Sequence, residues 1–459
     1  MNADPSFITL KSLTVDLVEP GQRPRRGALA CRLGRNISFD TAILETFSST
    51  NWRPVVYDAL VVAAAVEFCD RSLSRSALNW GRRFDVHVPV HDPARWMDAQ
   101  VTRSLVGALN FLTGDEWHFH FRARKAKAEL PPQSRMEFPT DAAAVMAYSE
   151  GMDSRAVYGL EHQRLGAQLV RVRVGTKWHD VPKKKSLVAP FAALPYEVKL
   201  DEDNAENSAR SRGFKFALIS AVAAYLINAP TAIVPESGQG ALAPALLPVG
   251  QGYADFRNHP DFTALMQKFV SALFGHRLTY TFPRIWSTKG ETLREYVDLA
   301  GEQAAWLNTR SCWQNARQVS VSKSRRQCGV CAACILRRLS VHAAGLSEPP
   351  EQYVWESLAA ATFEAGAANG FTQVTKALRE YAIAGVLHFK HLAQIRDSSS
   401  YGMVRRRVTM DLSRSLSQPA DEVGQKLDRL LEQHAKEWSA FTNDLGSQSF
   451  VKKWMDIAS

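Results

Sequence analysis

Apolar residues in the first 128 positions alternate with polar ones in some stretches and run continuously in others. Residues 13–17 and 84–90 alternate, as strands with one buried face do. Residues 55–68 form an apolar run of helical length between them. This mixture predicts a separate N-terminal α+β domain over residues 1–128. A charged, proline-containing stretch follows, and we therefore expect residues 129–139 to form a linker.

After residue 140 the pattern changes to short apolar strands that alternate with longer helical segments. The expected order is strand 144–148, helix 154–165, strand 168–174, helix 208–227 and strand 231–234. Repeated units of strand and helix predict an α/β domain over residues 140–345, with helices covering a parallel sheet. Such sheets bind ligands at the carboxyl ends of their strands, so segments 149–154 and 236–240 should face one crevice. Turning the chain is the alternative role for the glycines of the second segment.

The last part of the chain carries a helical pattern. Apolar residues and one histidine recur at helical spacing: Val423, Leu427, Leu430, Leu431, His434, Trp438 and Phe441. Ser417 and Pro419 precede them as start signals. We therefore predict a helical C-terminal extension over residues 346–459. We interpret its apolar face as packing against the core or against a partner subunit.

The segment between the first strand and helix of the α/β domain reads Ser-Glu-Gly-Met-Asp-Ser over residues 149–154. Small residues at Ser149, Gly151 and Ser154 let backbone N–H groups approach phosphate oxygens, and a helix N-terminus adds partial positive charge. This arrangement predicts a loop that cradles the pyrophosphate of ATP, with Asp153 as a ligand of the accompanying Mg²⁺. A serine-rich helix N-cap without nucleotide chemistry is the alternative.

Four of the six cysteines lie within 23 residues: Cys312, Cys328, Cys331 and Cys334. Four thiolates at this spacing can surround one tetrahedral Zn²⁺, and Gly329 permits a tight turn between two of them. Because the four cysteines would occupy all four coordination positions of the ion, we expect a structural zinc site that holds no activated water. An iron–sulfur cluster and disulfide bonds are the alternatives. Buried packing accounts for Cys31 and Cys69.

Length and composition agree with a protein of two or three domains. The chain has 459 residues, 46% of them hydrophobic, and a formal net charge of +10. This charge favours anionic partners, for which ATP suffices and nucleic acid is a further candidate. The longest apolar stretch, residues 214–227, contains Lys215 and Ser220 and is too short for a membrane span. The first residues lack a secretory signal, so we expect a cytoplasmic protein without membrane contact.

Together these motifs resemble those of a known family. The loop at residues 149–154, and the four cysteines with an arginine after them, resemble QueC. QueC is the ATP-dependent 7-cyano-7-deazaguanine synthase family of the PP-loop, or adenine nucleotide α-hydrolase-like, superfamily. Arg212, in a basic loop before an apolar helix, and Lys289, in the segment leading to the first cysteine, match two further family positions. The resemblance covers residues 140–345 and implies a PP-loop fold for that domain.

Two features depart from the family pattern. Glu150 stands where the family has the first of two loop glycines, and a longer insert separates the first cysteine from the second. The insert carries the basic run 322–326, which we interpret as solvent-exposed, with contact to an anionic partner as the alternative. With these differences and its long extensions, the chain most resembles the QueC-like subunit of the Qat anti-phage defence system (QatC).

The resemblance implies an ATP-dependent carbon–nitrogen ligase that forms AMP and pyrophosphate. A 7-deazaguanine carboxylate attacks the α-phosphate of ATP, and the acyl-adenylate then reacts with a nitrogen nucleophile. The implied residues are Ser149, Gly151, Asp153, Ser154 and Gly238 for ATP, Asp153, Lys289 and Arg212 for catalysis, and Tyr253, Asp255 and Arg257 for substrate. A plain polar loop is the alternative for the last three. The implied cofactors are structural Zn²⁺, and Mg²⁺ with ATP as co-substrate.

Three functions are compatible with these observations. In the first, the enzyme activates a 7-deazapurine for anti-phage defence and transfers it to an amine, with a protein from the same operon as acceptor or partner. In the second, it makes 7-cyano-7-deazaguanine from ammonia for queuosine biosynthesis. In the third, it is a zinc and nucleic-acid binding module without ATP chemistry. The released product separates the first two functions, and ATP turnover separates both from the third.

Overall fold

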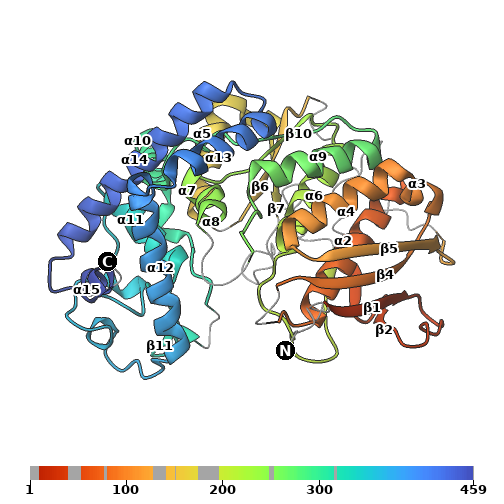
Figure 1. The fold of residues 1–459 in the computed structure, drawn as a ribbon, viewed down its shortest axis with the longest axis horizontal. Coiled ribbons are helices and arrows are strands. Elements are labelled where there is room, and N and C mark those ends of the chain that lie inside the picture. Colours follow the sequence, from red (N-terminus) through yellow and green to blue (C-terminus); the bar gives the residue numbers. More distant parts are fainter. Residues whose placement is uncertain are drawn as a thin grey trace, which may run out of the picture. The chain divides into compact units, whose positions relative to one another are not determined.

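The computed structural model describes residues 10–39, 53–76, 80–127, 141–149, 151–173, 196–247, 253–314 and 318–457. The chain forms two compact units, each built from segments that are separate in the sequence (Figure 1). The first unit comprises Met1–Tyr148, Leu165–Val234 and Asp255–Thr281, and the second comprises Ser149–Arg164, Pro235–Ala254 and Phe282–Ser459. The domain limits drawn from the sequence at residues 128, 139 and 345 stay a prediction.

The first unit contains a four-stranded parallel sheet in the order β2-β1-β4-β5. Its strands are β1 (Lys11–Val18), β2 (Leu29–Arg32), β4 (Arg82–Val90) and β5 (Glu116–Ala123). The helices between β2 and β5 in the chain are α2 (Pro54–Ser72), α3 (Pro93–Met97) and α4 (Ala99–Thr113). Helical crossovers return the chain in the same direction, so this segment is α/β and the α+β prediction is wrong.

The two faces of this sheet differ in polarity. On one face Phe84 stacks on Trp117, with 4.5 Å between ring centroids, and both side chains are buried. On the other face His87 stacks on His120 at 4.4 Å. The strand periodicity predicted for residues 84–90 is confirmed, because successive side chains of a strand point to opposite faces.

A second parallel sheet of the first unit has the order β10-β9-β6-β7. Its strands are β6 (Ala144–Tyr148), β7 (Leu169–Arg173), β9 (Thr231–Ile233) and β10 (Thr279–Thr281), while β8 (Tyr196–Val198) pairs with β3 (Ile37–Phe39). The chain continues from β6 to β7 on one side of β6 and returns to β9 on the other. The strand order therefore reverses between β6 and β9, which is where open α/β sheets bind ligands.

The helices next to this sheet depart in part from the predicted bounds. Helix α5 (Met152–Leu165) begins two residues early, so Asp153 and Ser154 belong to the helix and not to the preceding loop. Helix α6 (Arg212–Leu226) begins later than predicted, because Ala209 has a φ of 49°, which a right-handed helix does not allow. Helix α9 (Pro260–Phe274) was not predicted, and it ends at Gly275 in the left-handed region.

The second unit is mainly helical. Its helices after the short α7 (Gly238–Ala241) and α8 (Ala243–Leu246) are α10 (Lys289–Ala300), α11 (Ala332–Ala343), α12 (Lys376–Gln394), α13 (Tyr401–Leu416), α14 (Ala420–Asp444) and α15 (Phe450–Ile457). Helices α11, α12 and α13 each pack against α14 (Figure 1). The helices predicted after residue 345 are thus present, and the α14 residues expected to share one face are buried. Within the described ranges, no helix combines the length and apolarity that crossing a membrane requires.

A group of buried charged side chains lies in the first unit. Arg82 on β4 is fully buried and donates to Asp70 Oδ1 at 2.6 Å and to Asp115 Oδ2 at 2.8 Å. Arg75 donates to both oxygens of Asp115 at 2.8 and 2.9 Å. Burial opposes ionisation of Asp70, but Arg82 and a hydrogen bond from Ser211 outweigh it and lower the pKa of Asp70. The group ties α2 to β4 and to the turn before β5.

We expect Arg82→Leu to destabilise the protein by about 3–5 kcal/mol, because it removes the cation that two buried carboxylates share. Arg83→Leu is the control, since the Arg83 side chain is half exposed and its ion pair with Glu116 contributes about 1 kcal/mol or less. Urea unfolding followed by tryptophan fluorescence measures both variants. Equal losses of stability in the two variants would contradict the role given to Arg82.

Candidate active site and metal centre

Strand β6 ends at Tyr148, and helix α5 begins four residues later. The Oγ atoms of Ser149 and Ser154 lie 3.0 Å apart, and Gly151 N donates to Ser149 Oγ at 3.1 Å. A Cβ atom at Gly151 would also lie 3.1 Å from Ser149 Oγ, so glycine is favoured in this turn. The turn gathers small polar side chains at a helix N-terminus, an arrangement that suits an anionic ligand. Glu150 lies outside the described residues.

Asp153, in the first turn of α5, forms an ion pair with Lys289 Nζ. Lys289 is the first residue of α10 and is 7% exposed. A capping box fixes this helix start, since Thr288 Oγ1 accepts from Glu291 N at 3.1 Å and Glu291 Oε2 accepts from Thr288 N at 2.8 Å. In the described part of the chain, Asp153 Oδ1 is buried and has no hydrogen-bond partner. Two residues predicted to act in catalysis therefore lie together in the second unit.

The start of α7 lies beside the same lysine. Gln239 Oε1 accepts from Lys289 N at 2.8 Å, and Gly238 N donates to Ser287 O at 3.0 Å. A Cβ atom at Gly238 would lie 2.3 Å from Ile285 O, so only glycine permits this approach. The contact of Gly238 with ATP stays a prediction. Gln239, which the sequence pattern did not single out, makes the polar contact to the lysine backbone.

His434 on α14 continues this series of hydrogen bonds and is fully buried. His434 Nδ1 accepts from Gln239 Nε2 at 2.8 Å, and His434 Nε2 donates to Phe389 O at 3.0 Å. A carbonyl only accepts, so Nε2 carries the proton and the imidazole is neutral. Burial lowers the pKa of His434 to about 4. His388 on α12 is a second buried histidine, and burial with the nearby His434 lowers its pKa to about 4.

Two residues predicted to bind substrate form an ion pair in the first unit. Asp255 Oδ2 accepts from Arg257 Nη2 at 2.5 Å and from Arg257 Nε at 2.9 Å. Arg210 approaches the same carboxylate at 3.4 Å. Burial opposes ionisation of Asp255, but Arg257 outweighs it and lowers the pKa of Asp255. Tyr253 belongs to the second unit and is half-buried. Contact of these residues with a substrate stays a prediction.

Arg212 lies in the first unit as the first residue of α6, and its side chain is exposed. Its guanidinium lies over the ring of Phe216 at 4.9 Å from the centroid. A Cβ atom at the next residue, Gly213, would lie 2.9 Å from Arg257 Cα, so α6 starts against the segment that carries Arg257. Three arginines with one carboxylate therefore lie on neighbouring segments of this unit, and their charge favours an anion.

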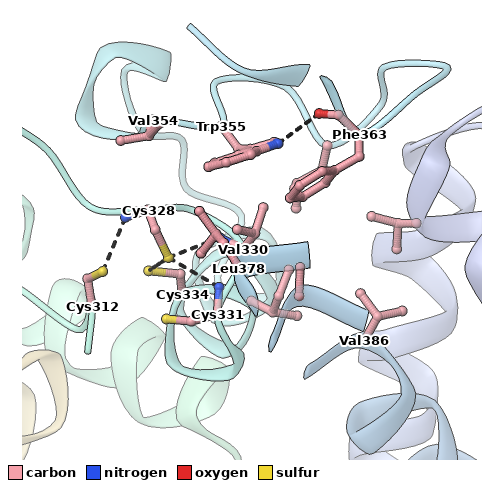
Figure 2. Close-up of a cluster of buried hydrophobic side chains, with 14 of the residues drawn as sticks. Cys312, Cys328, Val330, Cys331, Cys334, Val354, Trp355, Phe363, Leu378 and Val386 are labelled. Carbon is pink, nitrogen blue, oxygen red and sulfur yellow. Dashed lines mark hydrogen bonds between the residues drawn. The ribbon is translucent and has the colours of Figure 1, made fainter. Parts of the chain in front are cut away.

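The four clustered cysteines meet at the start of α11 (Figure 2). Each can offer one sulfur ligand, and the four Sγ atoms lie within 4.8 Å of one another. Gly329, between the first two cysteines of the core motif, has a φ of 86° and makes the turn that the sequence led us to expect. All six cysteines are free, so the disulfide alternative is wrong for this structure. Among the residues that the structure describes, this is the single such group.

The geometry of the cluster fits a zinc ion. Sulfurs of a tetrahedral four-thiolate site lie about 3.8 Å apart for Zn–S bonds of about 2.3 Å, and Cys328 Sγ lies 3.7 Å from Cys334 Sγ. Backbone N–H groups point at the sulfurs, from Cys331 N to Cys328 Sγ and from Cys328 N to Cys312 Sγ, each at 3.2 Å. These donors stabilise thiolates, as the outer contacts of metal ligands do. The four side chains would hold Zn²⁺ as a structural ion.

The long insert after Cys312 contains a short hairpin. Strands β11 (Ser320–Val321) and β12 (Ser324–Arg325) pair antiparallel. Ser322 and Lys323 between them have φ of 50° and 64°, as tight hairpin turns require. Residues 322–325 are exposed, as the solvated interpretation of the basic run requires, and contact with an anionic partner stays the alternative; Arg326 pairs with Glu356 at 2.6 Å.

Fold and site define an α/β protein with a helical second unit and a four-thiol centre able to hold a metal ion. Residues 247–345, about a fifth of the chain, match the family described as QueC, queuosine biosynthesis protein QueC. The matched segment includes Lys289 and the four cysteines, whereas the loop at 149–154 lies outside it. Neither the curated proteins nor the solved structures gave a match. The predicted QueC resemblance is therefore supported over this segment, without support for the QatC subgroup.

We expect Cys331→Ala to lose bound zinc and to lower the melting temperature, because three thiolates leave the site open. Cys69→Ala is the control, since Cys69 is a buried cysteine of the first unit. Elemental analysis of the purified proteins and differential scanning fluorimetry measure both effects. Stoichiometric zinc in Cys331→Ala would contradict the assignment, and iron with sulfide in the native protein would identify the alternative cluster.

Stability should fall as the pH drops from about 6.5 towards 4. In this range the unfolded chain binds a proton at His434, whereas the buried imidazole stays neutral, so acid favours the unfolded state. The contribution of His434 is complete above its unfolded pKa of 6.5 and is about 3 kcal/mol smaller near pH 4. Urea unfolding across this range should show a smaller pH dependence in His434→Asn than in the native protein. The same pH dependence in both proteins would exclude His434 as its source.

Proposed function

We propose that this protein is a QueC-like, ATP-dependent carbon–nitrogen ligase that activates a 7-deazaguanine carboxylate as an acyl-adenylate. One observation carries the proposal. Asp153 pairs with Lys289 next to the Ser149–Ser154 turn, and Lys289 lies within the segment that matches QueC. A buried cation, a carboxylate and a helix N-terminus within one unit are the groups that a polyphosphate requires.

Each residue of the loop has a proposed role toward ATP. Ser149, Gly151 and Ser154 donate hydrogen bonds to the oxygens of the departing pyrophosphate. Lys289 neutralises charge that develops on the phosphates. Asp153 would hold Mg²⁺ through Oδ1, since that ion typically takes one or two carboxylates plus phosphate oxygens. Gly238 is proposed to let the backbone of segment 236–240 approach the nucleotide.

The proposed reaction has two steps. A substrate carboxylate oxygen attacks the α-phosphorus, the bond to the oxygen that bridges the α- and β-phosphates breaks, and pyrophosphate leaves with the electron pair. A nitrogen nucleophile then attacks the acyl carbon and loses a proton to solvent, so that a carbon–nitrogen bond forms while AMP leaves with the electron pair of the broken C–O bond. A catalytic role for Arg212, a residue of the first unit, stays a prediction. The protein contributes orientation of the reactants and compensation of charge.

The proposals for the substrate and the acceptor rest on the residues of the matched segment and on the length of the chain outside the resemblance. Tyr253, Asp255 and Arg257 lie within the segment that matches QueC, and they can stack on and hydrogen-bond a purine-like ring. The long segments outside the resemblance, residues 1–139 and 346–459, support a task beyond the family's own. We propose a larger amine acceptor, such as a partner protein, and a cytoplasmic role in anti-phage defence of the Qat type.

Synthesis of 7-cyano-7-deazaguanine from ammonia is the second candidate function. The description of the matched family, which names queuosine biosynthesis, favours it. Activation of the carboxylate is common to both candidates. They differ in the nucleophile. Ammonia gives a primary amide, and a second activation by ATP must remove the amide oxygen before a free nitrile is released, whereas a larger amine gives an amide conjugate.

With ATP and 7-carboxy-7-deazaguanine, we expect the native protein to release AMP and pyrophosphate. Asp153→Ala should lower this rate by about 100-fold or more, because the ion pair with Lys289 and the proposed Mg²⁺ ligand are both lost. Asp298→Ala on α10 is the control, since that carboxylate is exposed. Chromatographic separation of AMP from ATP measures the rates.

The products of the same assay decide between the candidates. Free 7-cyano-7-deazaguanine formed with ammonia would favour queuosine biosynthesis over transfer to a larger amine. No AMP from folded, zinc-loaded protein, with and without candidate partner proteins, would overturn both. Nucleic-acid binding that Asp153→Ala leaves unchanged would then favour the non-catalytic module.

A further inference from the structure

We propose that helix α14 positions Lys289, so that His434 and Glu437 are positioning residues of the ATP site. Both lie outside the segment that matches QueC. The inference rests on the role proposed above for Lys289. The contacts that support it all lie within the second unit.

His434 fixes the orientation of the Gln239 amide. Phe389 O accepts from His434 Nε2, which leaves Nδ1 as an acceptor for Gln239 Nε2. Gln239 Oε1 is then directed at Lys289 N, from which it accepts at 2.8 Å. The opposite orientation of the amide would place its NH₂ group against the N–H of Lys289. The imidazole therefore determines a hydrogen bond on the backbone of the lysine.

Glu437 holds the residue before Lys289. Thr288 Oγ1 donates to Glu437 Oε1 at 2.6 Å, and Gln433 Nε2 donates to the same oxygen at 3.0 Å. Glu437 is 7% exposed, and burial raises its pKa. Because Thr288 is the N-cap of α10, this contact fixes the first turn of the helix that begins with Lys289.

Two further α14 residues contact the same segments. Arg429 Nη1 donates to Trp286 O and to Glu291 Oε2, each at 2.9 Å. A Cβ atom at Gly238 would lie 2.4 Å from a Leu430 methyl, so α14 packs directly on the start of α7. With Leu430 as i, His434 and Glu437 stand at i+4 and i+7, which places all three on one face of the helix.

The polar side chains on this face of α14 are the reason to propose a positioning role for it in addition to packing. Burying a histidine and a glutamate costs free energy unless each finds hydrogen-bond partners. An apolar face would pack as well without that cost. Here each side chain makes one hydrogen bond to a residue that contacts or precedes Lys289, so together they fix the backbone from which the lysine reaches Asp153.

The test measures how fast Lys289 of the full-length protein reacts with acetyl N-hydroxysuccinimide, by mass spectrometry of its peptides. We expect slow reaction in the native protein, because Lys289 is buried and paired with Asp153. His434→Leu should raise the rate about tenfold, the effect of one lost hydrogen bond. His434→Asn should stay near the native rate, since its side-chain oxygen can replace Nδ1 as acceptor.

His388→Asn is the matched control, because it removes a different buried histidine of the second unit. A native rate in His434→Leu, or an equal rise in His388→Asn, would overturn the proposal. This outcome does not depend on ATP turnover, so it is distinct from failure of the adenylation assay. In an active enzyme, His434→Leu should also lower kcat for AMP formation by about 10- to 100-fold with little change in KM.

Discussion

The ion pair between Lys289 and Asp153 is the contact on which the candidate site depends, because it joins two helix starts that are far apart in the sequence. The partial positive charge at both helix starts favours negative charge, which an aspartate partly supplies and a phosphate would supply further. The lysine balances that charge in a place where water has little access. A ligand that binds the Asp153 carboxylate in place of Lys289 must therefore also supply a negative partner for the Lys289 ammonium group.

The metal centre and the site share one helical framework. The cysteines lie against an apolar cluster that includes Val330, Trp355 and Leu378 (Figure 2). Cys331 is the N-cap of α11, and Cys334 lies in the first turn of that helix. Helix α11 in turn packs on α10 and α14, and Gly290 of α10 approaches it so closely that a Cβ atom would lie 2.7 Å from Ala343 Cβ. A metal ion that orders α11 would therefore also support the helix that carries Lys289.

Prediction from the sequence succeeded where the signal was local. Strand β6, the face of α14 and the core motif of Cys328, Cys331 and Cys334 each depend on spacing within a few residues. The N-terminal segment was mistaken for α+β, because alternation reveals strands but not the direction in which they pair. Asp153 was placed in the loop, because helix ends depend on capping contacts that a periodic pattern does not contain.

By itself the sequence determined which four cysteines can bind a metal ion and which face of α14 is buried. His434 shows the limit of that information, since its position in an apolar stripe indicates burial but not its partner. Only the tertiary structure decided that Gln239 and His434, 195 positions apart, and Thr288 and Glu437, 149 positions apart, meet around Lys289. The reason is that periodicity follows from the geometry of a single helix or strand. A hydrogen bond between distant segments depends instead on how the whole chain packs.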